Sequence, residues 1–296
     1  MTRREFTGAA GAVFAPQAGP RFIKSICSIN LPRQMPLAEC FQQAKNAGFE
    51  GLEIRMGDEV NLNSTPDQVK RVGEAARTAG VAVVSLWASD PLAPNPLNHP
   101  EAAVRARGVE VVHKAIDCAT WLGCGALLLV PGRLGQGPKF MYGYQDTWDR
   151  VTAEIRKIIP YAERAKVMIT PENVWNKFLV SPLEMRAFVD QFRSPWLQTQ
   201  FDVGNVMQFG YPQDWILTLG PRIKRVHLKD YKLSTRAEQG RFVDLFEGDV
   251  DFKEVMAALV KVGYRGYVSP EYSYDPGRPD QLRRISEALD RILSLA

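Results

Sequence analysis

Short apolar runs alternate eight times with longer segments of helical periodicity along most of this chain. Apolar runs of roughly five to eight residues, each followed by a helical segment, indicate repeated strand–helix units around a parallel sheet. The predicted strands cover residues 23–30, 51–56, 81–88, 125–132, 166–173, 197–205, 223–230 and 265–272. This repeat restricts the chain to the α/β class.

The segments between the predicted strands carry signals that begin a helix. Ser181 is placed as an N-cap, Pro182 occupies the first helical position, and Glu184 completes a capping box. Thr65 and Pro66 have the same roles at another predicted helix start. Helices are therefore predicted where the repeat requires them.

Eight strand–helix units either close as a barrel or spread as a doubly wound open sheet. No G-x-G-x-x-G motif follows the first predicted strand, and no linker divides the chain. We therefore predict an α/β fold with a single (β/α)8 TIM barrel over residues 21–296. The Pro-rich segment 90–100 and the Gly-rich segment 132–144 follow the third and fourth predicted strands, where barrel loops cover an active site.

Residues 1–20 differ from this repeat. Residues 2–6 read TRREF and precede a short run of small, weakly apolar residues. This pattern predicts a twin-arginine export signal or, if it is not a signal, a disordered leader. The matching locations are the periplasm and, as the alternative, the cytoplasm.

Composition limits the partners of the protein. The 37 basic and 33 acidic residues are interspersed, so the net charge of +4 forms no basic tail or cluster that would indicate nucleic acid. No apolar stretch reads as a membrane span, and we expect no membrane insertion. The four cysteines form no CxxC pair, so neither a zinc ribbon nor a disulfide scaffold is predicted.

Ionisable residues, which are costly in free energy to bury, stand at the ends of the last four predicted strands. They are Glu172, Asp202, His227 and Glu271. The carboxyl ends of barrel strands meet around one mouth, so these distant positions become neighbours. Each also falls on the polar face of its strand, opposite residues that meet the helices. Three carboxylates and an imidazole would repel and titrate without a cation, which predicts one divalent metal ion such as Mn²⁺, Mg²⁺, Co²⁺ or Zn²⁺.

The motifs PENVWN, FDVGN, RVHLKD and SPEY, in this order, resemble the sugar phosphate isomerase/epimerase family of xylose-isomerase-like TIM barrels. That family includes ketose 3-epimerases, inosose dehydratases and the endonuclease IV type, and the likeness spans residues 22–293 as a pattern of strands. The resemblance implies that the four strand-end residues bind one divalent metal, with Mn²⁺ as the first choice. It also implies that Glu172 and Glu271 move the substrate proton through an enediolate.

Other residues near the strand ends are expected to contact the substrate. Lys229 lies two residues past the strand-end histidine on the same face, where it can stabilise the enediolate oxygen or hold a hydroxyl or phosphate. Asn176, Glu53 and Trp87 are expected on the wall of the site. Asn205 stands where the family commonly has a substrate-binding histidine, and this departure leaves the identity of the sugar open.

The first choice of function is a metal-dependent epimerase or isomerase whose partner is a ketose or ketose phosphate. A lyase of the inosose dehydratase kind is the alternative, because the same groups would stabilise an enolate. An endonuclease IV-like nuclease is a remote alternative, since its zinc cluster needs extra histidines and both His99 and His113 lie away from strand ends. A noncatalytic sugar-binding protein is another remote alternative, and a dimer or tetramer is left open.

Overall fold

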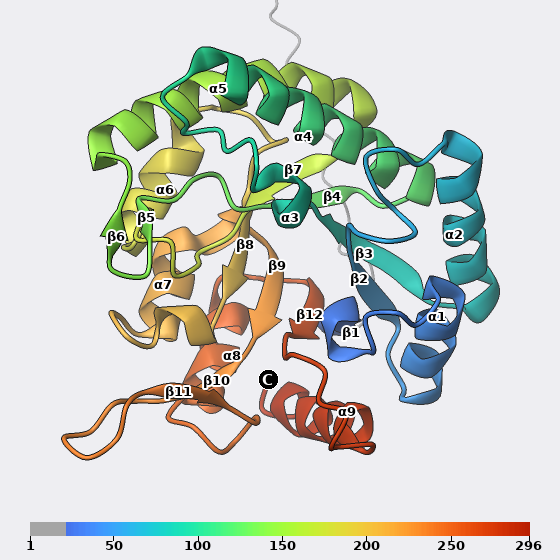
Figure 1. The fold of residues 1–296 in the computed structure, drawn as a ribbon. Helices are drawn as coiled ribbons and strands as arrows, with labels where there is room; N and C mark the ends of the chain where they lie inside the picture. The colour runs from blue at the N-terminus through green and yellow to red at the C-terminus, as the bar shows by residue number, and fades with distance from the viewer. Residues whose placement is uncertain (1–21) are drawn as a thin grey trace, which may run out of the picture.

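The computed structural model describes residues 22–296, so the predicted signal segment lies outside the described residues. Eight parallel strands line the centre of the molecule, and helices surround them (Figure 1). Each strand falls on one of the eight predicted segments. The strands are β1 (Phe22–Cys27), β2 (Gly51–Arg55), β3 (Ala82–Trp87), β4 (Ala126–Leu129), β7 (Met168–Pro171), β8 (Thr199–Asp202), β9 (Ile223–Leu228) and β12 (Gly266–Pro270).

The strands are hydrogen-bonded in the order β7-β4-β3-β2-β1-β12-β9-β8, so strands that are neighbours in this repeat are neighbours in space. The two ends of this sheet also meet, through parallel bridges from Ile169 to Leu197 and from Glu172 to Gln200. The sheet is therefore a closed barrel, and the predicted (β/α)8 fold is confirmed. The second bridge places Glu172 at the seam where the barrel closes.

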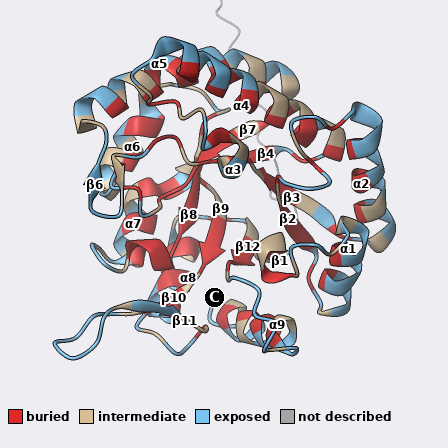
Figure 2. Cartoon of the chain, viewed as in Figure 1, coloured by how far each residue is buried: buried red, intermediate tan, exposed pale blue. Residues whose placement is uncertain are grey.

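The outer layer consists of eight longer helices within residues 22–296. They are α1 (Leu37–Asn46), α2 (Pro66–Ala79), α4 (Ala102–Leu122), α5 (Tyr144–Ala165), α6 (Pro182–Asp190), α7 (Pro212–Leu219), α8 (Phe252–Lys261) and α9 (Gln281–Leu293). Figure 2 shows the strands and the inward sides of the helices as buried and the outward sides of the helices as exposed. None of the described helices is both long and apolar enough to cross a membrane.

The helix starts follow the N-cap and proline signals read from the sequence, but the Glu184 side chain does not complete the capping box predicted with Ser181. The Ser181 hydroxyl accepts a hydrogen bond from the backbone N–H of Glu184 at 3.2 Å. Thr65 and Gln68 form a reciprocal capping box at the start of α2, where Pro66 occupies the first turn. Such bonds satisfy amides that have no partner inside the helix, and each contributes about 1 kcal/mol to stability.

The outward face of a strand packs against the helices and the inward face points into the barrel, as the alternation of side chains along the strands predicts. Outward-facing apolar residues such as Ile169 and Phe201 are completely buried against the helices, and Phe201 stacks on Trp215 of α7 at a ring distance of 6.1 Å. Inward-facing polar residues hydrogen-bond to one another, as do the hydroxyls of Ser25 on β1 and Ser269 on the neighbouring β12 at 2.7 Å. The barrel interior is therefore a packed polar core that ends at the carboxyl ends of the strands.

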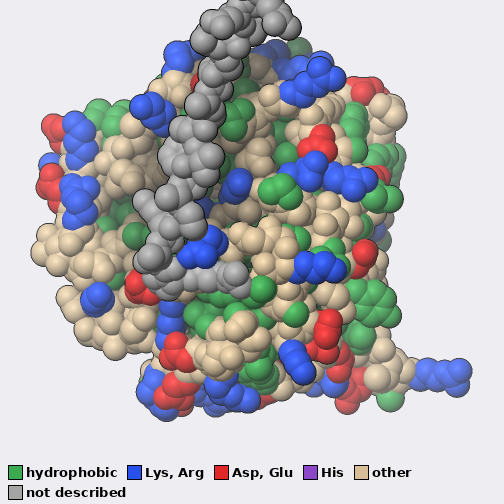
Figure 3. Space-filling model, turned by 180° about the vertical axis from the view of Figure 1, so that it is seen from behind, with side chains coloured by type: hydrophobic (Ala, Val, Ile, Leu, Met, Phe, Trp, Pro, Cys, Tyr) green, Lys and Arg blue, Asp and Glu red, His purple; other side chains and the backbone are tan. Residues whose placement is uncertain are grey.

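Several short elements lie in the connections between the strands and the longer helices and were not predicted. They are η1 (Ser28–Asn30), α3 (Ser89–Leu92), the hairpin of β5 (Gly135–Gln136) and β6 (Lys139–Phe140), η2 (Gly204–Val206), η3 (Gly220–Arg222), and the hairpin of β10 (Asp230–Lys232) and β11 (Arg241–Val243). Elements of two to four residues are too short to show a period in the sequence. On the face seen in Figure 3, basic and acidic side chains of the described residues intermingle, as the composition suggests.

Candidate active site and metal centre

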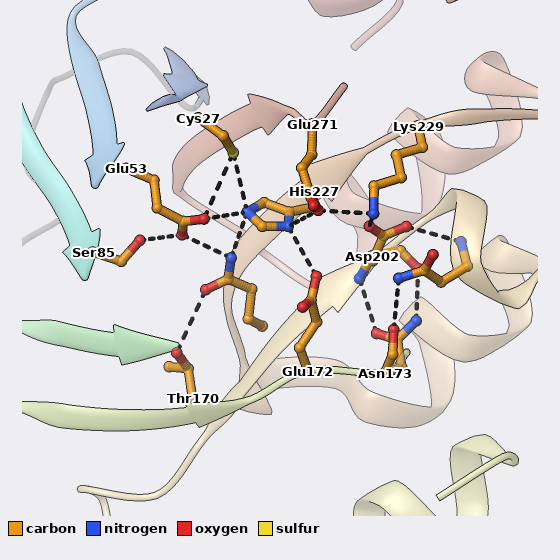
Figure 4. A network of polar contacts seen from close by, with 12 residues as sticks. Cys27, Glu53, Ser85, Thr170, Glu172, Asn173, Asp202, His227, Lys229 and Glu271 are labelled. Atoms are coloured by element: carbon orange, nitrogen blue, oxygen red, sulfur yellow. Dashed lines mark hydrogen bonds and ion pairs between the residues drawn. The ribbon is translucent and has the colours of Figure 1, made fainter. Parts of the chain in front are cut away.

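The four strand-end residues meet at the carboxyl end of the barrel. Nδ1 of His227 lies 2.9 Å from Oε1 of Glu172 and 2.9 Å from Oε2 of Glu271. One ligand atom each from Glu172, Asp202, His227 and Glu271 lies within 4.8 Å of the others. Figure 4 shows these side chains pointing toward one another. The tertiary structure therefore brings together all four residues that the sequence predicts as ligands.

Backbone pairing sets the height of these residues in the barrel. Asp202 is the last residue of β8 and lies directly opposite His227 of β9. Glu172 and Glu271 come one residue after β7 and β12, and each still donates its backbone N–H to the neighbouring strand at 3.1 Å. All four side chains therefore leave the sheet at nearly the same level.

The FDVGN motif orients the carboxylate of Asp202. The Asn173 amide bonds both to the backbone N–H of Asp202 at 2.9 Å and to its backbone oxygen at 2.8 Å. The N–H of Asn205 donates to Oδ1 of Asp202 at 2.8 Å, which directs Oδ2 toward the site. A Cβ at Gly204 would lie 2.6 Å from Cβ of Lys229, so only glycine lets these two segments approach so closely.

Two carboxylate oxygens in the cluster lack a hydrogen bond of good geometry. Oδ2 of Asp202 and Oε2 of Glu271 are buried and have no hydrogen-bond partner among residues 22–296. Lys229 lies within ion-pair distance of both, at 2.9 and 2.8 Å. Buried oxygens with incomplete partners are costly, and three carboxylates beside an imidazole nitrogen suit a hard-to-borderline divalent ion. The residues present therefore fit a divalent metal.

The two glutamates have opposite electrostatic surroundings. Burial raises the pKa of Glu172 to about 7, although His227 opposes the change. Burial also acts to raise the pKa of Glu271, but Lys229 and His227 outweigh it and hold that pKa at about 2. The protein groups by themselves thus shift the two pKa values in opposite directions, upward for Glu172 and downward for Glu271.

Glu53 lies beneath His227. Its Oε1 is 3.0 Å from Nε2 of His227, on the edge of the ring opposite Glu172 (Figure 4). Its Oε2 accepts hydrogen bonds from Nε2 of Gln200 at 3.0 Å and from the hydroxyl of Ser85. With 1% of its surface exposed, Glu53 does not reach the wall of the site. This corrects the expectation that it contacts a substrate.

A cavity of 620 Å³ opens above the cluster, a size typical of small-molecule sites. It is lined from segments 90–100 and 132–144, as the sequence predicts, and by both glutamates. Lys229, Trp87 and Asn176 also reach its wall, where they were expected.

Asn205 does not line this cavity. It is 6% exposed, and its amide donates to the backbone oxygen of Asn173 at 2.9 Å. Together with its backbone bond to Asp202, this contact makes Asn205 a support of the ligand loop. The expected substrate contact at Asn205 is therefore revised in the same way as that of Glu53.

Ser89, His99 and Trp175 line the cavity, although the sequence analysis gave none of them a role in the site. The hydroxyl of Ser89 and Nε1 of Trp87 are buried and have no hydrogen-bond partner within residues 22–296. Nδ1 of His99 accepts a hydrogen bond from the backbone of Glu101 at 3.1 Å, which leaves Nε2–H as its donor in the neutral ring. The sequence feature that could have indicated these residues is their position in loops that follow strands.

Comparison with known proteins agrees with this geometry. The family model described as xylose isomerase-like TIM barrel matches residues 41–294. The chain belongs to this family. The resemblance read from the strand-end motifs is thereby confirmed, and the xylose isomerase-like barrel can be compared with its relatives.

The curated relatives of this barrel include 3-epimerases. L-ribulose-5-phosphate 3-epimerase UlaE of Escherichia coli K12 is 28% identical over 244 residues, which cover 79% of this chain and 82% of that protein. A putative L-ribulose-5-phosphate 3-epimerase, SgbU of Haemophilus influenzae, is 28% identical over 246 residues, or 80% of this chain and 83% of that protein.

Solved structures show the same fold. D-allulose 3-epimerase from Methylomonas sp., in complex with D-allulose, has a TM-score of 0.75 at 22% identity and covers 94% of this chain and 98% of its own. D-psicose 3-epimerase from Clostridium cellulolyticum H10, with D-tagatose, has a TM-score of 0.75 at 17% identity and covers 92% of this chain and 99% of its own. At these identities the likeness shows the fold alone.

Proposed function

We propose that this xylose isomerase-like barrel is a divalent-metal-dependent sugar epimerase or isomerase that acts on a ketose or ketose phosphate. The observation that carries the proposal is the pair Glu172 and Glu271, both 2.9 Å from Nδ1 of His227 on the floor of the cavity. Two glutamates at a candidate metal site are the groups needed to move a proton next to a carbonyl. The names of the curated relatives support the same chemistry.

The metal would be held by the cluster of Glu172, Asp202, His227 and Glu271. Mn²⁺ is our first choice, with Mg²⁺, Co²⁺ and Zn²⁺ as alternatives, because the donors are three carboxylates and one imidazole. The chemistry supplied by such an ion is polarisation of the substrate carbonyl and of its neighbouring hydroxyl, which makes the adjacent C–H acidic.

The protein's own part in the reaction is proton transfer. One glutamate takes the proton from the carbon next to the carbonyl, and the other returns a proton to the opposite face, which inverts that carbon. Return of the proton to the adjacent carbon would give isomerisation instead. The pKa directions, upward for Glu172 and downward for Glu271, support one acid and one base in the same site.

Substrate contacts are proposed for Lys229 and Trp87. The Lys229 ammonium lines the cavity beside Glu271, where it can stabilise the enediolate oxygen or hold a hydroxyl or phosphate. Trp87 lines the cavity and its Nε1–H is buried, so we propose that the indole ring packs against the carbon skeleton of the sugar.

Asn176 lines the wall of the cavity with a side chain that is also hydrogen-bonded within the protein. Its Nδ2 donates to the backbone oxygen of Gly132 at 2.6 Å, and its Oδ1 accepts from the backbone N–H of Phe178 at 3.0 Å. These bonds tie the loop after β4 to the loop after β7. We therefore propose that Asn176 keeps the cavity open at a constant width.

The test is hydrogen exchange in D₂O. The protein loaded with Mn²⁺ is incubated with free and phosphorylated ketoses, and the metal is removed before NMR is used to follow deuterium at the carbon next to the carbonyl. Exchange is expected in at least one ketose, and the Glu172→Gln and Glu271→Gln variants should lose it. Glu74→Gln changes an exposed glutamate on α2 and serves as the control.

Absence of exchange in every ketose, or exchange that survives the double Glu172→Gln, Glu271→Gln variant, would overturn the proposed mechanism. The same samples distinguish the lyase alternative. A dehydratase would release water and accumulate an unsaturated ketone, whereas an epimerase or isomerase leaves the elemental composition of the sugar unchanged apart from deuterium.

A further inference from the structure

We propose that Glu53 is a positioning residue that holds Nε2–H of His227 and thereby leaves Nδ1 of the same ring free to bind the metal. This inference rests on the proposed metal site. It gives Glu53 a role that neither its place in the sequence nor the position of the cavity suggests.

The two ring nitrogens of His227 face different groups. Nδ1 lies 2.9 Å from Glu172 and Glu271, which belong to the predicted ligand set. Nε2 lies 3.0 Å from Oε1 of Glu53, on the other edge of the ring (Figure 4). Nε2 also lies 2.6 Å from the amide nitrogen of Gln200 and 3.4 Å from Sγ of Cys27. Of these three neighbours the Glu53 carboxylate is the one that can only accept the ring proton, and the Gln200 amide already donates to Oε2 of Glu53. Both His227 and Glu53 are 1% exposed, so no bulk water competes for Nε2. A carboxylate that accepts one ring N–H determines which nitrogen remains available to a metal.

Glu53 is itself held from several strands. Gln200 of β8 donates to its Oε2 at 3.0 Å, and Ser85 of β3 donates to the same oxygen. The thiol of Cys27 on β1 lies 3.6 Å from the other oxygen, Oε1. Because donors on separate strands bind Oε2, the carboxylate cannot rotate, and Oε1 stays directed at His227.

A second metal ion is the competing explanation for these contacts. Cys27, Glu53 and His227 each offer a ligand atom within 4.8 Å of the others. However, Oε2 of Glu53 already accepts from Ser85 and Gln200, and the amide nitrogen of Gln200 lies 2.6 Å from Nε2 of His227, where an ion would have to sit. None of the three candidate ligands lines the cavity. The geometry favours a hydrogen-bonded support over a second ion.

This arrangement makes an unusual prediction for Glu53→Gln. The hydroxyl of Ser85 and the amide of Gln200 would bind the oxygen of the new side chain, which turns its NH₂ group toward Nε2 of His227. Nε2 must then accept a hydrogen bond, and the proton of the neutral ring moves to Nδ1, where it blocks the metal. Glu53→Gln should therefore weaken metal binding at least as strongly as Glu53→Ala, although glutamine is closer to glutamate in shape.

The first measurement is the affinity for Mn²⁺, determined by calorimetry on metal-free wild type, Glu53→Gln and Glu53→Ala. We expect one ion per wild-type chain and a loss of about 10- to 100-fold in both variants. Glu154→Gln is the matched control, because Glu154 is also buried but pairs with Arg105 at 2.9 Å. Circular dichroism verifies that each variant is folded.

If the Glu53→Gln variant is folded and binds Mn²⁺ with the affinity of wild type, the positioning role of Glu53 is overturned. Two ions per chain, with one lost in Cys27→Ala, would replace it by the second metal site. Wild-type protein that binds Mn²⁺ tightly but exchanges no ketose proton would overturn the proposed function and leave the role of Glu53 intact. Protein that binds no metal would overturn both.

A second measurement needs no variant at Glu53. The chain has only three histidines, so ¹⁵N-labelled histidine gives few ring signals. In protein loaded with diamagnetic Zn²⁺, a protonated Nε2 and a metal-bound Nδ1 on His227 are expected. The His227→Gln variant assigns the signal, and the opposite pattern, with Nδ1 protonated, would overturn the proposal even if the Glu53 variants do not fold.

Discussion

The ammonium of Lys229 lies 2.9 Å from Oδ2 of Asp202, and both side chains are largely buried. The same ammonium lies 2.8 Å from Oε2 of Glu271. Lys229 is therefore a cation in direct contact with the predicted ligand set, and it offsets part of the negative charge when no metal is bound. Metal and lysine must share the same carboxylates, which links metal binding to the stability of the barrel.

Lys229→Met should destabilise the metal-free protein by about 3–5 kcal/mol, because it leaves buried carboxylates without their cation. Addition of Mn²⁺ should restore part of this loss. Urea unfolding with and without metal measures both effects. Lys232→Met is the control, since Lys232 pairs with Asp249 at 2.7 Å near the surface and its loss should cost only about 0–1 kcal/mol. Equal losses in the two variants would contradict this account.

Removal of the metal should lower the melting temperature of wild type, and its return should restore it. An ion that binds only the folded state adds about 2.7 kcal/mol when its free concentration is 100 times the Kd. Asp202→Asn removes a predicted ligand, so its melting temperature should respond much less to Mn²⁺. Calorimetric scans after chelation and after reloading measure the shift in melting temperature. If neither treatment changes the melting temperature of the wild-type protein, the result argues against the site.

Trp87→Phe should weaken substrate binding while the ring still fills the wall. The change removes part of the indole surface that lines the cavity. Loss of apolar contact of about 0.5–1.5 kcal/mol corresponds to a rise of roughly 2- to 12-fold in KM, with a smaller change in kcat. Trp121→Phe on α4 is the control, because Trp121 packs against the core outside the cavity. Matching KM values for the two variants would exclude a substrate contact at Trp87.

Gly204→Ala should destabilise the protein by about 1–3 kcal/mol and also weaken Mn²⁺ binding. The new Cβ would lie 2.6 Å from Cβ of Lys229 and 2.9 Å from its backbone oxygen, so the two segments beside the ligands must separate. Gly125→Ala is the matched control, since no atom lies within 4 Å of a Cβ built there. Denaturant midpoints and Mn²⁺ affinities together test the prediction, which fails if both glycine variants behave alike.

Local patterns were sufficient to predict the eight strands and the four metal-ligand candidates. A strand buried between helices and a polar interior must alternate along its length, and a carboxylate or imidazole at its end is costly unless it has a function. Ser181 and Thr65 likewise capped helices as expected, because a cap depends on residues within one turn. The short hairpins after β4 and β9 escaped prediction because strands of two or three residues show no period in the sequence.

Position along the strand separates Glu53 from the predicted ligands. Glu53 is the middle residue of β2, whereas Asp202 ends β8 and Glu271 follows β12. Each residue advances a strand by about 3.3 Å, so two residues of difference move a side chain from the mouth of a barrel into the layer below. The alternation shows that Glu53 points inward, but it does not reveal its depth or its partner.

By itself, the sequence determined which residues point into the barrel and which of them stand at strand ends, because period and position are properties of each segment. Only the tertiary structure decided that Glu53 lies 3.0 Å beneath His227, that Asn205 supports Asp202, and that Trp87 opens onto the cavity. These relationships depend on closure of the barrel, which joins strands that are far apart in the chain, and on the stagger that sets side-chain heights inside it.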